Sequence, residues 1–347
     1  MYLVSINFGS ETFKYAIFDK DSLKELHRDN INIFKISLDA KKKIFSRLAR
    51  LVDPREIKAV GHRYVNGGDE LTRTTKLSPK VLKELKKMHS LAPLHNPNNY
   101  LGVELSKKIW PQVDHYAVFD TAFYQTLPEY TRVYALPWKM YSKMGIKRMG
   151  FHGISHNYVL DQISQKIGKP KNRLNLISVH LGGGCSVTAI KKGQAIDTSM
   201  GYTPLEGLAM MSRSGDLDLG AALEIMKKQK YTPDKMLLFL NKRCGMQGLA
   251  GTSNFKAIID RAQKGNSRAC LSFDMFVYRV KKYIASYYGI LGKTDAIGFT
   301  GGIGYYSALT RRAVCRGLPF LKDVKVFPIQ ANEERAIALQ IKSQLKK

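Results

Sequence analysis

The residues best suited to chemistry in this sequence lie where short apolar runs end in polar, glycine-containing turns. Asn7-Phe8-Gly9-Ser10 follows the apolar run 2–6, and the turn 180–186 follows the run 174–179. Consecutive backbone N–H groups in such turns form nests that bind anions. Two nests facing a cleft would suit a polyphosphate, so the pattern indicates two similar half-structures that bind one.

A third glycine turn, 300–304, follows the strand predicted at 296–299. Glycines after a strand are common, so this turn is a weak signal by itself. No GxxxxGK[ST] loop is present, and no GxGxxG motif follows the first strand. Because these motifs are typical of P-loop and dinucleotide-binding proteins, their absence argues against both classes.

Two charged side chains stand at positions where α/β proteins place their sites. Asp120 ends the strand predicted at 116–119, and Arg63 lies between a predicted strand and Gly67-Gly68. Polar groups at strand ends are frequently functional. An Asp in that position also commonly caps the next helix, and an isolated Arg is more often a surface charge.

Two histidines, His152 and His156, have the i, i+4 spacing of a helical metal pair. Such histidines more often hydrogen-bond to backbone groups. Of the two we expect His152 to be functional and His156 to be structural.

Alternating strand and helix patterns position these residues and predict an α/β fold. Runs 2–6 and 15–18 predict a hairpin, and runs 174–179 and 187–190 predict a second one that turns again at Lys192-Gly193. The remaining predicted elements are a helix that begins at Ser78-Pro79 with Val81, Leu82, Leu85 and Met88 on one face, a strand at 324–329, and a helix from Asn332-Glu333-Glu334 to Lys347. Glu333 and Glu334 would also suit the first turn of that helix electrostatically.

Length and charge limit the class of protein. The chain has 347 residues, which suggests two domains, and 44% hydrophobic residues, which is ordinary for folded proteins. The net charge of +28 favours anionic partners. The excess is spread along the chain, with only short runs at 41–43, 86–87 and 346–347. We therefore expect a solvated basic surface and no specific nucleic-acid partner.

The remaining composition points to an intracellular setting. No apolar run is long enough to span a membrane, and no signal peptide is visible, so we expect a cytoplasmic protein without a membrane partner. The four cysteines, Cys185, Cys244, Cys270 and Cys315, form no CxxC pair. We expect them to be reduced and without a metal cluster, with Cys185 accessible in its glycine-rich loop.

Many short motifs, in order along nearly the whole chain, resemble those of one enzyme family. They are Ser5-Ile6-Asn7, Gly9-Ser10, Lys14, and the segments 61–68, 91–97, 119–123, 150–156, 180–182, 197–208, 213–216, 300–304 and 332–334. The chain resembles the acetate/propionate kinase family of the sugar kinase–Hsp70–actin fold. No single motif is specific, but this many in order is.

The resemblance implies a two-domain, ribonuclease H-like α/β fold with an interdomain cleft, and a role for each matching residue. It implies Asn7 and Glu333 as the Mg²⁺ site, where Mn²⁺ could substitute, and Asp120, His152 and Arg213 as catalytic residues. The implied substrate-binding residues are Arg63 for the carboxylate and Val65, Leu94, Phe151 and Pro204 for the acetate methyl group. The implied nucleotide-binding residues are Lys14, His180, Leu181, Gly182, Gly183, Gly184, Asn254, Phe255, Lys256, Gly302, Ile303, Gly304, Tyr305 and Tyr306.

The chemistry of phosphoryl transfer accounts for these residue types independently. The reaction depends on charge stabilisation and positioning, which arginines and an imidazole supply to the equatorial oxygens. Mg²⁺ prefers oxygen ligands and keeps several waters, so Asn7 and Glu333 would suffice. A carboxylate nucleophile is already ionised near neutral pH. We therefore interpret Asp120 as orienting Arg63, Arg213 or the metal waters, not as accepting a proton.

Three departures from the family pattern fall on the nucleotide side. Gly183 stands where the family usually has Asn, Tyr305-Tyr306 replaces Glu-Asn, and Asn254-Phe255-Lys256 replaces Asp-Phe-Arg with one residue missing. The chain is also shorter than typical members, with a gap between about 316 and 324. The acyl-phosphate side is intact, so these changes concern adenosine affinity and the choice of phosphoryl donor.

These observations predict domains of 1–149 plus 332–347 and of 150–331, with Mg²⁺-dependent, reversible transfer between ATP and acetate giving acetyl phosphate and ADP. The resemblance also implies a homodimer. The alternatives are a kinase that prefers propionate, one that uses another donor such as pyrophosphate, and a non-catalytic homologue that binds anions or nucleic acid.

Overall fold

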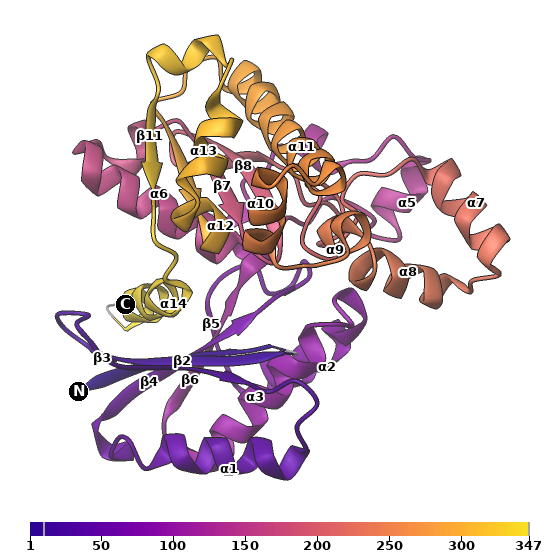
Figure 1. The fold of residues 1–347 in the computed structure, drawn as a ribbon. Coiled ribbons are helices and arrows are strands. Elements are labelled where there is room, and N and C mark those ends of the chain that lie inside the picture. The colour runs from indigo at the N-terminus through magenta and orange to yellow at the C-terminus, as the bar shows by residue number, and fades with distance from the viewer. Residues whose placement is uncertain (10, 346–347) are drawn as a thin grey trace. The chain divides into compact units, whose positions relative to one another are not determined.

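The structure is a computed structural model that describes residues 1–9 and 11–345 (Figure 1). Ser10 of the first predicted glycine turn and Lys346 and Lys347 at the C-terminus lie outside the described residues. The strands are β1 (Tyr2–Phe8), β2 (Thr12–Asp19), β3 (Glu25–Asn32), β4 (Ile57–Tyr64), β5 (Thr75–Lys76), β6 (Asp114–Phe119), β7 (Leu176–Leu181), β8 (Cys185–Lys191), β9 (Gln194–Thr198), β10 (Ala296–Thr300) and β11 (Lys325–Pro328).

Helices occupy most of the connections between these strands. They are α1 (Leu38–Ala49), α2 (Pro79–Lys87), α3 (Asn96–Ile109), α4 (Glu129–Arg132), α5 (Trp138–Ser142), α6 (Gly153–Ile167), α7 (Leu219–Gln229), α8 (Pro233–Lys242), α9 (Gly245–Ala250), α10 (Phe255–Gln263), α11 (Ser267–Leu291), α12 (Gly301–Tyr306), α13 (Ala308–Cys315) and α14 (Glu333–Gln344). Short 3₁₀ turns lie at Pro54–Glu56, Met88–Leu91, Asp120–Tyr124, Lys171–Arg173 and Pro319–Lys322.

In the described residues the strands form two mixed sheets with one shared topology. The first sheet has the order β3-β2-β1-β4-β6-β5 and the second β11-β10-β7-β8-β9. In each, an antiparallel meander of three strands (β1–β3, β7–β9) is followed by two strands parallel to the first of them (β4 and β6, β10 and β11). The prediction of two similar half-structures is confirmed.

The register makes the two halves equivalent residue by residue at the strand ends. Ser5 of β1 pairs with Gly61 of β4, and Ser178 of β7 pairs with Gly298 of β10. The turn that follows β1 and the turn that follows β7 therefore occupy equivalent positions in their two sheets. The α/β class expected from the sequence is confirmed.

The chain divides into two compact units in its described part. The first contains Met1–Gln125, Gly153–Tyr158 and the segment from Asn332 onwards, and the second contains Thr126–His152 and Val159–Ala331. The sequence placed residues 126–149 in the first domain instead. They belong with the second unit because Thr126 Oγ1 donates to Ala195 O at 3.0 Å and Arg148 donates to the carbonyl of Thr198 at 3.0 Å.

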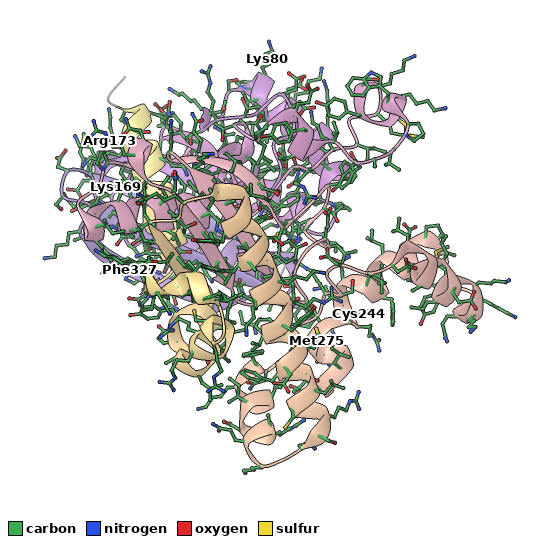
Figure 2. All side chains as sticks on the ribbon, turned by 90° about the horizontal axis from the view of Figure 1, so that it is seen from above. Lys80, Lys169, Arg173, Cys244, Met275 and Phe327 are labelled. Carbon is green, nitrogen blue, oxygen red and sulfur yellow. The ribbon has the colours of Figure 1, made fainter. Side chains whose placement is uncertain are left out.

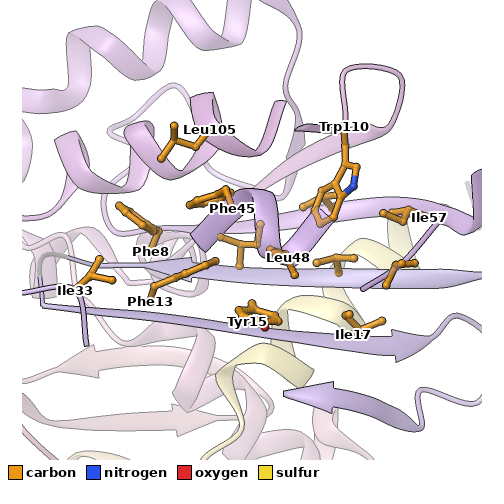
Figure 3. Close-up of a cluster of buried hydrophobic side chains, with 14 residues drawn as sticks. Phe8, Phe13, Tyr15, Ile17, Ile33, Phe45, Leu48, Ile57, Leu105 and Trp110 are labelled. Carbon is orange, nitrogen blue, oxygen red and sulfur yellow. The ribbon is translucent and has the colours of Figure 1, made fainter. Parts of the chain in front are cut away.

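Aromatic packing holds helices α1 and α3 on one face of the first sheet (Figure 3). The ring of Phe45 from α1 stacks on Phe13 of β2 at 4.9 Å and also contacts Phe8 of β1. Leu105 of α3 and Trp110 complete this side of the core. Side chains alternate between the two faces of the sheet along β1. Asn7 and the residues two and four positions before it therefore point to the other face.

Helix α14 covers the opposite face of the first sheet (Figure 1). A Cβ at Gly61 would lie only 2.6 Å from Ile337 Cγ2 of α14, so glycine is required for this close approach. Gly298 plays the same part in the second sheet, where a Cβ would lie 2.5 Å from Val159 Cγ1 of α6. The predicted cap of α2 is confirmed, since Ser78 accepts from Val81 N and Pro79 occupies the first turn.

Two local expectations were wrong. Residues 301–306 form the short helix α12 where the sequence predicted a turn, and its first residue, Gly301, has a φ of 76°. Cys185 is fully buried rather than accessible, since it opens strand β8 in the centre of the second sheet, and burial raises the pKa of its thiol to about 12.

Basic side chains are spread over the described surface (Figure 2). The nitrogen-tipped side chains in that view are not gathered on one element. No helix among the described residues is long and apolar enough to cross a membrane.

Candidate active site

The first unit brings together four of the predicted site residues. Arg63 donates from Nη2 and Nε to Asp120 Oδ2 at 2.6 and 3.1 Å. Its Nη1 lies 3.4 Å from both Asn7 Oδ1 and Glu333 Oε2. Asn7 Nδ2 donates to Glu333 Oε2 at 2.9 Å. We call Asn7, Arg63, Asp120 and Glu333 the Arg63 cluster.

The sheet places these side chains at the carboxyl ends of its parallel strands, where α/β proteins build their sites. Asn7 lies at the end of β1, and Arg63 lies near the end of the neighbouring strand β4. Asp120 directly follows β6, which pairs with β4 up to Phe119. Glu333 arrives from the far end of the chain as the first residue of α14.

In the Arg63 cluster, burial and charge hold Arg63 and its carboxylate partners as a preorganised ion-paired group. Burial alone would lower the pKa of Arg63, but the carboxylates of Asp120 and Glu333 outweigh it and raise that pKa. Burial raises the pKa of Asp120, while Arg63 and the Ile154 amide act in the opposite direction. Asp120 therefore holds Arg63 through two hydrogen bonds, which is compatible with the first of the three tasks expected for it, orienting Arg63, Arg213 or the metal waters. It does not cap the turn that follows, in which the cap residue is Phe119.

The remaining charged neighbours lie on the same face of the sheet. Lys14 of β2 pairs directly with Asn7, so both side chains point toward α14. Glu334 is 3% exposed and forms an ion pair with Arg28 of β3 at 3.0 Å. Arg28 also donates to Asn332, the cap of α14, at 2.6 Å. These contacts fix the first turn of α14 and therefore the place of Glu333.

The oxygen donors of the Arg63 cluster fit Mg²⁺ that keeps most of its waters. Asn7 Oδ1 and the Glu333 carboxylate are hard oxygen ligands of the type that Mg²⁺ prefers. Among the residues described, no group of three or more His, Cys, Asp or Glu side chains could hold a metal ion. A cation here would therefore depend on water and substrate phosphates for its other ligands.

Two asparagines that the sequence analysis gave no role hold the loop after β4. Asn99 Oδ1 accepts from Val65 N at 3.1 Å, and Asn99 Nδ2 donates to Phe8 O at 2.9 Å. Asn96 accepts from Asn66 N and donates to Asn66 O. Both are buried in α3. The motif containing Asn96 carried the family resemblance, but only the structure reveals its bridging role.

The second unit brings together another group of predicted residues. His152 has a φ of 60°, a left-handed conformation that is costly for a residue with a Cβ. Its Nδ1 lies 2.9 Å from Ser186 Oγ, and its ring stacks on that of His180 at 4.4 Å. His152 ends the second unit's segment and directly precedes helix α6.

Arg213 completes this group. A Cβ at Gly184 would lie 3.1 Å from His152 Nε2 and 3.6 Å from Arg213 Nη1, so glycine leaves room for both side chains. Arg213 Nη1 donates to Pro204 O at 3.3 Å. We call His152, His180, Gly184, Pro204 and Arg213 the His152 group.

The two predicted phosphate loops of the second unit lie side by side at the ends of β7 and β10. His180 pairs with Thr300, and a Cβ at Gly182 would lie 3.9 Å from Gly302 N. A Cβ at Gly301 would overlap Leu181 O, and Gly301 has a positive φ of 76°, so this position requires glycine. Gly183 and Gly302 have open space in the Cβ direction.

The other predicted nucleotide-side residues have mixed surroundings. In α12, Ile303 is partly exposed and Gly304 is buried; Tyr305 is half-buried and its ring contacts Tyr306, which is 74% exposed. Asn254 caps α10 by accepting from Ala257 N. Phe255 is buried against Phe276, and Lys256 is exposed. Asn254 and Phe255 therefore have structural roles that the sequence did not indicate.

The four residues predicted to contact the methyl group differ in burial. Val65 is buried and Leu94 half-buried in the first unit, whereas Phe151 is buried and Pro204 half-buried in the second. His156, predicted to be structural, is buried in α6.

These two sheets and the residues at their strand ends define a two-domain phosphotransferase fold of the sugar kinase–Hsp70–actin type. The Acetokinase family model matches residues 2–339, and the chain belongs to the acetokinase family.

Individual relatives agree with this assignment. The acetate kinase of Sulfurovum sp. (strain NBC37-1) is 44% identical over 91% of this chain and 80% of its own. The crystal structure of Porphyromonas gingivalis acetate kinase is 32% identical with a TM-score of 0.89, covering 100% of both chains. A propionate kinase structure from Francisella tularensis subsp. tularensis SCHU S4 is 32% identical with a TM-score of 0.90, covering 98% of both.

Proposed function

We propose that the protein transfers the γ-phosphoryl group of ATP to acetate, reversibly and with Mg²⁺, giving acetyl phosphate and ADP. The observation that carries the proposal is the Arg63 cluster, in which a partly buried guanidinium is held by Asp120 and leaves one edge toward Asn7 and Glu333. Membership of the acetokinase family supports the same reaction.

Each residue of the proposed site has a task that its geometry suits. Arg63, fixed by Asp120, binds the acetate carboxylate, which is already ionised and needs no general base. His152 and Arg213 donate to the equatorial oxygens of the phosphoryl group as charge redistributes over them. Val65, Leu94, Phe151 and Pro204 each offer an apolar side chain to the methyl group.

The residues of the nucleotide side hold the polyphosphate. The backbone of Gly183, Gly184 and the adjoining Gly302 offers N–H groups to it, and Lys14 adds charge. The Gly182 N–H instead donates to Gly184 O at 3.0 Å and shapes the turn. Asn7 and Glu333 hold the Mg²⁺, with Mn²⁺ as a substitute, and the ion supplies charge to the phosphate oxygens when bound.

The direct test is a hydroxamate assay for acyl phosphate. ATP, GTP and pyrophosphate are each offered with acetate, propionate or butyrate, with and without a chelator of Mg²⁺. We expect ATP with acetate to give the highest kcat/KM and the chelator to abolish it. A protein that forms no acyl phosphate from any pair would overturn the proposal.

Two alternatives rest on specific observations. A propionate preference is compatible with the structural similarity to a propionate kinase. A different donor is compatible with Gly183, Tyr305 and Tyr306, and with the structural use of Asn254. The same assay separates both from the main proposal through the best acid and the best donor.

A binding protein without catalysis is the remaining alternative, suggested by the net charge of +28. We propose that this charge is incidental and that no nucleic acid is bound specifically. Binding through counterion release alone weakens steeply with added salt. Tight binding to one sequence at physiological salt would favour the binding protein instead.

Assembly and location complete the proposal. We propose a homodimer in the cytoplasm. The dimer is supported by exposed leucines on the second unit, Leu219 and Leu223 of α7 and Leu238 of α8, which are 79, 64 and 54% exposed. Sedimentation analysis at micromolar concentration tests it, and a monomer at all concentrations would refute it.

A further inference from the structure

A charged cluster in the second unit binds the segments that carry the His152 group. Glu206 Oε1 accepts from Arg148 Nη2 at 2.6 Å, and Glu206 Oε2 accepts from the Tyr134 hydroxyl at 2.5 Å. We call Tyr134, Arg148 and Glu206 the Glu206 cluster. Burial and the Glu206 carboxylate raise the pKa of Tyr134, so its hydroxyl stays protonated and donates.

The Glu206 cluster also binds the backbone of the loop that follows β9. Arg148 Nη1 donates to Thr198 O at 3.0 Å and to Met200 O at 3.1 Å. The Tyr134 hydroxyl accepts from Tyr202 N at 2.8 Å. A Cβ at Gly201 would overlap the Tyr134 hydroxyl and the Glu206 carboxylate, so the loop closes tightly around the cluster.

From this loop, contacts run to His152 in one direction. Gly201 O accepts from Met149 N at 3.0 Å and from Gly150 N at 3.3 Å. Phe151 and His152 follow immediately along the chain. Because His152 has a left-handed backbone conformation, the residues before it must hold it in place.

In the other direction, contacts run to Arg213. Pro204, two residues before Glu206, accepts from Arg213 Nη1 at 3.3 Å. Gly207, the residue after Glu206, donates from its N–H to Asp216 Oδ1 at 2.8 Å and accepts from Asp216 N at the same distance. Residues 207–216 thus form a closed loop around Arg213 whose base adjoins Glu206.

We propose that Glu206 is a positioning residue for phosphoryl transfer: with Arg148 and Tyr134 it fixes the segments that place His152 and Arg213 relative to each other. This inference rests on the proposed function of those two residues. It assigns a task to a carboxylate whose hydrogen bonds are to Arg148 and Tyr134. It also explains why a charged residue occurs inside the loop that contains Pro204.

The exposure of the Glu206 cluster allows a positioning role to be distinguished from a purely structural one. The Glu206 side chain is 32% exposed and that of Arg148 is 17% exposed. An ion pair whose carboxylate water still reaches contributes less to stability than one whose carboxylate is fully buried. A displacement of about 1 Å near reacting groups, in contrast, can lower a rate about 100-fold. The loss of rate on removing Glu206 should therefore far exceed the loss of stability.

The first experiment compares Glu206→Gln and Tyr134→Phe with a matched control, Asp295→Asn. Asp295 is also a partly buried carboxylate of the second unit, paired with Lys169 at 2.7 Å and bound to Asn175 N at 2.8 Å. We expect kcat/KM for acetate to fall about 10- to 100-fold in both cluster variants. The KM for ATP and the melting temperature should change no more than in the control.

The opposite result is clear. If Glu206→Gln keeps the parent kcat/KM, or loses only as much activity and stability as Asp295→Asn, the inference is wrong. A variant that lowers the melting temperature and leaves kcat unchanged would indicate a structural role alone.

The second experiment does not depend on the reaction. Amide hydrogen exchange is measured in Glu206→Gln, Asp295→Asn and the parent protein. We expect faster exchange in 148–152 and 198–216 for Glu206→Gln and no such change for the control. Unchanged exchange would overturn the inference. If exchange is faster in Glu206→Gln but the parent protein makes no acyl phosphate, the proposed function is rejected and the role of Glu206 in holding these segments is retained.

Discussion

At the scale of single residues, three side chains of the proposed site are held by neighbouring groups that differ in chemistry. Asp120 fixes Arg63 through two hydrogen bonds to one carboxylate oxygen, and Ser186 fixes His152 through Nδ1. Arg213 contacts the neutral carbonyl of Pro204. These different surroundings predict different costs of removing the two arginines.

Replacing Arg213 with Ala should cost rate far more than stability. Arg213 is partly exposed and donates a hydrogen bond to the neutral carbonyl of Pro204, so the fold does not depend on burying its charge. A charge-stabilising arginine can contribute about 10³–10⁵ in kcat. Steady-state kinetics together with thermal unfolding test this. Near-parent turnover in Arg213→Ala would remove Arg213 from the proposed mechanism.

Replacing Arg63 with Ala should cost both rate and stability. Asp120 is 1% exposed and would lose its charged partner. Breaking a buried ion pair from one side typically costs about 3–5 kcal/mol. Urea unfolding measures that cost, and the double variant Arg63→Ala/Asp120→Ala provides the control. The double variant should recover stability but not activity; if it is as unstable as Arg63→Ala, the unpaired carboxylate is not the cause.

Gly183→Asn should improve the use of ATP without changing that of acetate. A Cβ at Gly183 meets nothing within 4 Å, so the amide can enter open space beside the phosphate loop. A hydrogen bond to a charged group contributes roughly 1.5–3 kcal/mol, which corresponds to a KM for ATP about 10- to 100-fold lower.

Two further variants sharpen this test. Gly289→Asn is the control, because Gly289 is also open but lies in α11. Adding Tyr305→Glu and Tyr306→Asn to Gly183→Asn restores the family's usual residues in α12. An unchanged KM for ATP in both, or a shift mainly in the KM for acetate, would mean that these positions do not tune the donor side.

At the scale of elements, the sequence predicted the strands because their patterns are local. Apolar runs ending in glycine turns identified both hairpins, and Ser78-Pro79 identified the start of α2. The missed features depend on tertiary context. Cys185 was expected to be accessible from its loop, but it is buried because β8 is central in its sheet.

The same reasoning applies to the site. Asn7, Arg63, Asp120 and Glu333 were predicted together from family motifs, and they meet in the structure. Asn99 and Glu206 were not singled out, because no local pattern distinguishes a bridging asparagine or an ion-paired glutamate from a surface one. Their tasks depend on partners 34 and 58 residues away along the chain.

The close packing of α14 on Gly61 leads to a prediction about the position of this helix. A Cβ at Gly61 would lie 2.6 Å from Ile337 Cγ2 and 3.0 Å from Ile341 Cγ2. Gly61→Ala should push α14 outward, carrying Glu333 away from Asn7, and overpacking of this kind costs about 1–3 kcal/mol. We expect the concentration of Mg²⁺ needed for half-maximal activity to rise and kcat to fall in the steady-state assay.

A second substitution separates the displacement of α14 from a general loss of stability. Adding Ile337→Ala to Gly61→Ala removes the clashing methyl group and should restore the requirement for Mg²⁺. Gly298→Ala is the matched control, since it produces a similar clash with Val159 in the other unit. A Mg²⁺ requirement that rises equally in that control would show that α14 does not position Glu333.

At the scale of the whole molecule, the two sheets share a topology but have acquired different residues at equivalent places. Ser5-Ile6-Asn7 and Ser178-Val179-His180 occupy the same register positions beside Gly61 and Gly298. The first copy ends in an amide oxygen suited to a cation and the second in an imidazole that stacks on His152. One architecture thus supplies both the proposed metal side and the proposed phosphoryl side.

Two histidines in the first unit predict how stability depends on pH. His115 Nε2 lies 3.0 Å from Trp110 O and His115 Nδ1 lies 2.9 Å from His62 Nε2, so both rings fit these contacts when neutral. Burial lowers the pKa of His115 to about 4 and that of His62 well below its ordinary value. The unfolded chain binds protons on both below about pH 6.5, whereas the folded protein does not.

The free energy of unfolding should therefore be constant above pH 6.5 and fall as the pH drops toward 4. His115 alone accounts for about 3 kcal/mol of that loss, at 1.36 kcal/mol for each pKa unit. Urea unfolding at pH 7.5 and 5.0 should show about 2 kcal/mol of it, because pH 5.0 lies about 1.5 units below the ordinary pKa of 6.5. In His115→Gln, whose amide can still donate to Trp110 O, the difference between the two pH values should shrink. An equal difference in parent and variant would show that other groups cause the acid sensitivity.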